Sequence, residues 1–133
     1  MVALGLIVGA FVLRVLVVQW IARRTARRAE GLTLDQLDPA AQAMIGDLPY
    51  ALLYFYSDHC RASRRTTPHV EACAALHDWV KLIDITRHPK VTESFRVRAT
   101  PTLISFRQGV VRKVQVGSLS RRDLNAACRR ITE

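Results

Sequence analysis

The stretch at residues 51–63 constrains the fold of this chain more than any other. It begins with five apolar residues, 51–55, whose length and aromatic content are typical of a buried β-strand. The turn and cap residues Ser57 and Asp58 follow, and Cys60 then falls in what would be the first turn of a helix. A helix N-terminus stabilises a thiolate. The alternative, a buried cysteine acting as a small apolar side chain, fits less well because its sequence neighbours are polar.

The rest of the chain predicts an α/β domain with a mixed sheet, in the order α-β-α-β-α-β-β-α. The first helix begins at Thr33 or Asp38 and stops at Gly46, and the helix that starts at Cys60 is kinked at Pro68. Ser120 caps the last helix. The expected helices are 33–45, 60–77, 88–95 and 121–131, and the expected strands are 51–55, 80–85, 102–106 and 111–116.

Several short motifs together resemble the thioredoxin family, whose active site is C-G-P-C at the start of the helix after a central strand. The corresponding residues here are C-R-A-S at 60–63, Pro68, the stretch V-R-A-T-P-T at 97–102, Gly109 and V-G-S-L-S at 116–120. The resemblance covers about residues 34–131. It implies a cis peptide bond at Pro101, where the pattern alone would allow an ordinary trans proline opening a strand. It also implies a peptide-binding surface made by His59, Arg61, Thr100 and Pro101.

Two departures from the family pattern bear on activity. The second cysteine is Ser63, and the family's buried acid on the central strand is Tyr54. Thiol–disulfide exchange needs one thiolate to attack and a second thiol to release the mixed disulfide. Cys60 can attack, and we expect the helix N-terminus, the arginines that follow and possible tuning by His59 to favour its thiolate. Ser63 can donate a hydrogen bond to that thiolate but cannot resolve a mixed disulfide.

The other two cysteines are less easily placed. Cys73 lies thirteen residues farther along the same predicted helix, roughly 20 Å away. Cys128 is on the last helix, and the sequence leaves its geometry open. The C-x-x-S motif is also that of monothiol glutaredoxins, but their glutathione-binding residues after the cis-proline do not match residues 116–119.

The N-terminal residues 2–22 form a nearly unbroken apolar segment, long enough to cross a bilayer core of about 30 Å. A cleaved signal peptide would need a basic region before the segment and a cleavage site after it, and neither is present. Trp20 falls where an interfacial aromatic belongs. Four arginines then follow, so the positive-inside rule predicts an outside N-terminus and a cytoplasmic domain in a membrane such as the bacterial inner membrane. We expect these arginines to contact anionic lipid headgroups: Arg23, Arg24, Arg27 and Arg28.

Three residues inside this segment suggest a membrane partner. Gly5 and Gly9 form a G-x-x-x-G pattern that allows another helix to approach closely, although glycine is common in membrane helices. Arg14 lies roughly 13 Å from the Arg23 end at helical rise, where a charge is costly unless it snorkels or meets a partner. We therefore expect Gly5, Gly9 and Arg14 to contact a membrane protein.

Composition narrows the kinds of partner and ligand that we expect this chain to bind. The formal net charge of +9 suits an anionic partner, but no aromatic-interleaved basic stripe is present, so we do not expect nucleic-acid binding. Three cysteines at unpatterned spacing make no disulfide framework, and no zinc-like spacing occurs, so we expect neither metal nor cofactor. The predicted organisation is a transmembrane helix at 1–22, a basic juxtamembrane linker at 23–33 and a thioredoxin-like domain at 34–133.

Two functions fit this organisation. The first is a non-enzymatic accessory or assembly subunit, or protein-binding module, of a larger membrane complex. The second is a monothiol oxidoreductase that forms mixed disulfides with a thiol-containing protein through Cys60. Fold analogy alone does not separate them.

Overall fold

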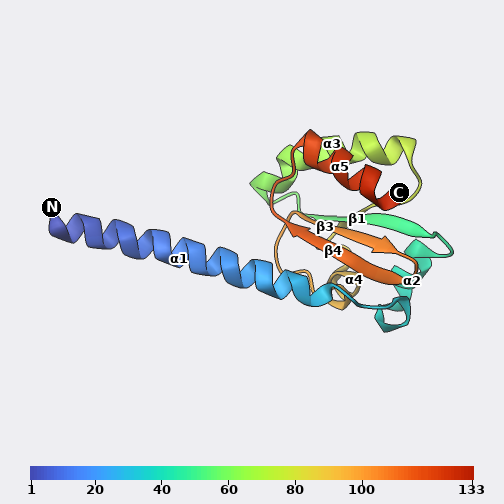
Figure 1. The fold of residues 1–133 in the computed structure, drawn as a ribbon, viewed down its shortest axis with the longest axis horizontal. Helices are drawn as coiled ribbons and strands as arrows, with labels where there is room; N and C mark the ends of the chain where they lie inside the picture. The colour runs from blue at the N-terminus through green and yellow to red at the C-terminus, as the bar shows by residue number, and fades with distance from the viewer.

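The computed structural model describes the backbone of residues 1–133 and every side chain except those of residues 22, 25 and 26. A long helix leads into an α/β domain with a four-stranded sheet between two layers of helices (Figure 1). The predicted architecture, a mixed sheet flanked by helices and preceded by an apolar helix, is confirmed. The elements are α1 (Val2–Ala26), η1 (Arg27–Ala29), η2 (Leu34–Gln36), α2 (Pro39–Ile45), β1 (Tyr50–Tyr56), α3 (Arg61–Leu76), β2 (Val80–Asp84), α4 (Pro89–Ser94), β3 (Thr102–Arg107), β4 (Val110–Val116) and α5 (Arg121–Thr132).

The strand order is β2-β1-β3-β4. β1 and β2 are parallel, while β3 is antiparallel to both β1 and β4. Gln108 and Gly109, with φ of 51° and 77°, form the tight turn that joins β3 to β4. The parallel pair places the end of β1, and therefore Cys60 just beyond it, next to the end of β2.

Alternate residues of β1 face two separate apolar clusters. Leu53 and Phe55 pack with α2 and α4 on one side of the sheet, while Leu52 and Tyr54 pack with α3 and α5 on the other. All four side chains are buried, which is why this run of the sequence is almost uniformly apolar. β1 is thus an inner strand that is covered by helices on both faces, and it leads directly to Cys60.

The predicted first helix is interrupted. Thr33 precedes the short turn η2, the chain becomes extended at Leu37, and α2 then begins after Asp38, whose carboxylate accepts a hydrogen bond from Ala40 N–H at 3.0 Å. Pro39 is the reason for the break. A proline disfavours helical backbone at the residue before it but suits the first position of a new helix.

The segment predicted as a linker at 23–33 is part of the folded structure. α1 continues to Ala26, Ala29 is fully buried, and the chain beyond it runs along the edge of β4. Gly31 N–H donates to the Val111 carbonyl at 2.8 Å, and Val111 N–H donates to the Leu32 carbonyl at 2.8 Å. The Glu30 carboxylate accepts from Val114 N–H at 3.2 Å. These bonds cover an otherwise open sheet edge, so the packed domain begins near Ala29 and not at residue 34.

Among the described residues, one helical segment, Val2–Ile21, is long and apolar enough to cross a membrane. Its side chains are exposed, and it projects away from the sheet (Figure 1). The beginning of α3 lies at the end of the domain that faces the N-terminus of α1 along the long axis of the molecule (Figure 1).

Candidate thiol site

Cys60 is the N-cap of α3, where the chain leaves β1 and turns into the helix. Its Sγ atom accepts a hydrogen bond from Ser63 N–H at 3.5 Å and lies 3.4 Å from the carbonyl oxygen of Thr100, to which the thiol donates. The side chain is partly exposed. The sulfur is therefore reachable from solvent and held by two backbone groups, one in the first turn of α3 and one in a loop forty residues beyond Cys60.

Local hydrogen bonds make Cys60 unusually acidic. Burial raises the pKa of its thiol, but hydrogen bonds from the surrounding groups outweigh this effect and lower the pKa from 9.0 to about 7. The side chains of Ser63 and Thr100 contribute most to the lowering, followed by backbone groups of Ser63 and Ala62. The arginines that we expected to contribute are exposed and are not among these principal groups: Arg61, Arg64 and Arg65.

Ser63 and Tyr54 form a buried polar layer beneath the sulfur. Ser63 is 1% exposed, and its hydroxyl accepts a hydrogen bond from Ser57 N–H at 3.4 Å. The Tyr54 hydroxyl donates to the Ser63 carbonyl at 3.4 Å and lies 3.1 Å from the Thr67 hydroxyl, which itself donates to that carbonyl at 2.7 Å. Burial raises the pKa of Tyr54, so its phenol keeps its proton where a carboxylate could accept one. The sequence singled out both positions, and Ser57 only as a turn and cap residue, but not Thr67, which also supports them.

Of the four predicted peptide-binding residues, Thr100 contacts the Cys60 sulfur directly. The Thr100–Pro101 peptide bond is cis, the Pro101 ring is buried, and Thr100 places its carbonyl on Cys60. Within the described part of the chain, no group accepts a hydrogen bond from Thr100 N–H, so it is available to an added strand. His59 and Arg61 are exposed on either side of Cys60.

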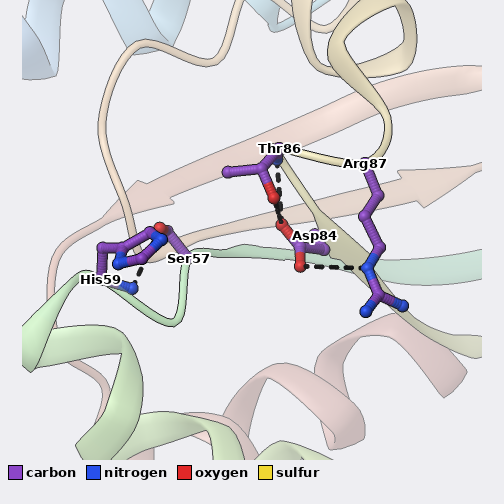
Figure 2. Close-up of polar contacts among 5 residues, drawn as sticks. All are labelled: Ser57, His59, Asp84, Thr86 and Arg87. Atoms are coloured by element: carbon purple, nitrogen blue, oxygen red, sulfur yellow. Dashed lines mark hydrogen bonds and ion pairs between the residues drawn. The ribbon is translucent and has the colours of Figure 1, made fainter.

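Figure 2 shows two further groups of polar contacts, which lie beyond the ends of β1 and β2. Ser57 accepts a hydrogen bond from His59 N–H at 3.3 Å, which fixes the loop before Cys60. At the end of β2, the Asp84 carboxylate accepts from the Thr86 hydroxyl at 2.6 Å and lies 3.8 Å from Arg87 Nε. The bonds from Thr86 lower the pKa of Asp84, so this carboxylate is charged at neutral pH. The Asp84 carboxylate thereby stabilises the turn that follows β2.

The remaining cysteines lie away from this site. Cys73 is in the last turns of α3, and its Sγ is 3.3 Å from Sγ of Cys128 in α5. This contact places Cys128, whose position the sequence left open, beside Cys73 and not beside Cys60. Throughout the described residues, no three His, Cys, Asp or Glu side chains gather closely enough to hold a metal ion.

The three residues expected to contact a membrane partner lie on α1. Gly5, Gly9 and Arg14 are all exposed, and nothing lies within 4 Å of where a Cβ would sit on either glycine. Near the end of the apolar segment, the Arg24 guanidinium lies over the Trp20 ring, 5.0 Å from its centroid. Such a pair suits a membrane interface, where the ring is half-desolvated and the cation reaches headgroups.

Comparisons with known proteins agree with this geometry. The family model described as Thioredoxin matches residues 41–130. A mutant thioredoxin from Halobacterium salinarum NRC-1 is 28% identical, with a TM-score of 0.62 over 68% of this chain and 81% of that one. Thioredoxin from Malassezia sympodialis is 19% identical, with a TM-score of 0.62 over 74% and 88% of the two chains. Oxidised thioredoxin from Plasmodium falciparum is 16% identical, with a TM-score of 0.60 over 74% and 95%. A search of curated protein sequences finds no match.

Proposed function

The chain belongs to the thioredoxin family, and we propose on that basis that it is a membrane-anchored protein whose Cys60 captures a partner polypeptide as a mixed disulfide. One observation carries the proposal. Cys60 has a pKa of about 7, but the position that would resolve a mixed disulfide is the hydroxyl of Ser63. In the capture step, the Cys60 thiolate attacks a disulfide of the partner, a new S–S bond forms, and the partner's other sulfur leaves as a thiolate. Release then needs an external thiol.

The peptide-binding part of the proposal rests on Thr100. Its unused N–H, next to the sulfur, would pair with an extended segment of the partner, and exposed Arg61 and His59 would flank that segment. This surface would bind a polypeptide even without covalent capture. The same geometry therefore also supports a protein-binding module. The covalent step would slow dissociation of the complex.

The partner would be a membrane protein. If α1 spans the bilayer, the end of the domain that carries Cys60 faces the membrane, because α3 begins on the side toward which α1 projects (Figure 1). We accordingly propose an accessory or assembly subunit of a membrane complex, with Gly5, Gly9 and Arg14 contacting another chain. A mid-membrane arginine costs about 2.5–3.5 kcal/mol on insertion scales, which an acidic or polar group of a partner would offset.

The orientation that follows from the arginine cluster is an outside N-terminus and a cytoplasmic domain. In this orientation the cluster would contact anionic headgroups of the inner leaflet. A reporter fused after Glu133 should be active only in the cytoplasm. Activity on the other side of the membrane would reverse the assigned orientation.

The membrane contact is tested separately by co-purification in mild detergent. Gly9→Leu should reduce the yield of the partner by blocking close helix approach, while Gly5→Ala, a smaller change on the same face, should reduce it less. Arg14→Leu should lose the partner although it inserts more easily. If all three variants retain the partner at the yield of the unaltered chain, α1 is only an anchor.

The capture step is tested on the purified full chain with a disulfide-bonded peptide. We expect one peptide adduct per chain on Cys60, stable until dithiothreitol is added, and no adduct at that position in Cys60→Ser. Repeated reduction of the peptide in the absence of a small thiol would show a complete redox cycle and would overturn the monothiol proposal.

A further inference from the structure

A pair of thiols lies on the outer side of the domain, separate from Cys60. On α3 the inward-facing positions recur at Ser63, Thr66 and Val70, and Cys73 continues this row toward the end of the helix. On α5, Cys128 lies next to buried Ala127. The two rows meet where the helices pack together, so that the sulfurs of Cys73 and Cys128 are 3.3 Å apart.

The pair is accessible to small molecules. Both cysteines are only partly buried, and they line a surface groove of about 730 Å³ between α3 and α5. Arg121 and Arg129 line the same groove, so its local charge favours an anionic reagent.

We propose that Cys73 and Cys128 are a second redox site, which forms an intramolecular disulfide by exchange with an anionic low-molecular-weight disulfide. The geometry requires little movement: an S–S bond is about 2.05 Å long, so the sulfurs need to approach by little more than 1 Å. Rotation about the side-chain torsions of two partly exposed residues supplies a displacement of that size.

The exchange proceeds in two steps. The Cys73 thiolate attacks one sulfur of the small disulfide, whose S–S bond breaks and releases one thiolate. The Cys128 sulfur then gives up its proton, attacks Cys73 and displaces the second thiolate. The two cysteines lose two electrons and two protons, and the small disulfide becomes two thiols. Burial and the neighbouring Cys73 raise the pKa of Cys128, so its thiol keeps its proton until the second step.

The new bond would connect α3 to α5 across 55 residues of sequence. It would leave Cys60 free, because Cys73 is thirteen residues away along α3, roughly 20 Å at helical rise. The pair is therefore unsuited to resolving a mixed disulfide on Cys60 in the same molecule, and the site does not depend on the function proposed for Cys60.

The test uses the full chain in detergent micelles, with Cys60→Ser to remove the third thiol and oxidised glutathione as the probe. We expect both remaining thiols to disappear without added glutathione mass, and a proteolytic digest to yield residues 73 and 128 in one linked peptide. The melting temperature should rise by about 10 °C, reversibly with dithiothreitol. Cystamine, a cationic disulfide, should react more slowly than oxidised glutathione.

A matched variant separates the disulfide from simple thiol modification. Cys128→Ser in the same background should keep one glutathione on Cys73 and show no such stabilisation. The proposal is overturned if the Cys60→Ser chain retains two free thiols, carries two glutathione groups or becomes linked only between molecules. Faster reaction with cystamine would overturn the assignment of an anionic reagent.

Discussion

The acidity of Cys60 can be tested by removing the hydroxyl that contributes most to it. Ser63→Ala removes the side chain that lowers the pKa of Cys60 most and leaves in place the backbone N–H that donates to the sulfur. A hydrogen bond to a charged group contributes about 1.5–3 kcal/mol, and one pKa unit corresponds to about 1.4 kcal/mol. We therefore expect the pKa of Cys60 to rise from about 7 to about 8 or higher.

The consequence for reactivity follows from the thiolate fraction. At pH 7 a thiol of pKa about 7 is about half ionised, whereas one of pKa 8 is about one-tenth ionised. Alkylation of Cys60 by iodoacetamide at pH 7 should accordingly slow by about fivefold in Ser63→Ala. In the unaltered chain the rate should increase through pH 7 and level off above about pH 8, because the thiolate is then fully formed. Mass spectrometry of the peptide that contains Cys60 measures the rate at this residue alone.

The matched control is Arg64→Gln, which removes an exposed positive charge from the same helix. We expect less than a twofold effect, and little change when salt is raised, since long-range charge is screened but a short hydrogen bond is not. The explanation by hydrogen bonds is refuted if Arg64→Gln slows alkylation as much as Ser63→Ala, or if the pH profile of Ser63→Ala is unchanged. Circular dichroism of both variants checks that the fold is retained, because Ser63→Ala also leaves Ser57 N–H without its acceptor.

Three further substitutions test the surrounding structure. Ser63→Cys should form a disulfide with Cys60 and confer insulin reduction on the chain; absence of activity despite that disulfide would show that the neutral phenol of Tyr54 or the surrounding surface also limits turnover. Tyr54→Phe should lower the free energy of unfolding by about 1 kcal/mol in urea, since its hydrogen bonds are lost while Thr67 still bonds the Ser63 carbonyl; an unchanged midpoint would contradict this. Ser120→Ala should cost about 1 kcal/mol by removing the cap of α5, and a stability equal to that of the unaltered chain would show that the cap is dispensable.

The elements that local sequence determines were predictable. The doubly buried β1, the Cys60 helix start, the Gln108-Gly109 turn and the Ser120 cap each depend on residues close together in the chain. The break at Pro39 was predictable in principle, since the two candidate caps, Thr33 and Asp38, begin two separate short helices.

Features that depend on tertiary contacts were not predictable from the residues alone. Residues 29–34 directly follow a cluster of four arginines in a segment that the sequence predicts as a linker, and it is the edge of β4 that gives them backbone partners. Cys73 and Cys128 meet because α3 and α5 share one face of the sheet, and their spacing from Val70 and Leu124 was the available signal. The sequence did not show that groups in direct contact with the sulfur, such as Ser63, would be among the principal causes of the lowered pKa of Cys60 and the exposed arginines would not.

The pairing of residues 29–34 with β4 limits how far the domain can move relative to α1. A free, flexible segment of the length of residues 23–33 would let the domain wander by about 18 Å. Held along the sheet edge, and further tied by a 3.0 Å hydrogen bond from the Arg96 guanidinium to the Arg28 carbonyl, the segment removes most of that freedom. If α1 spans a bilayer, the domain would stay within a narrow range of heights above it, and Cys60 would have a high effective concentration only toward targets at that height.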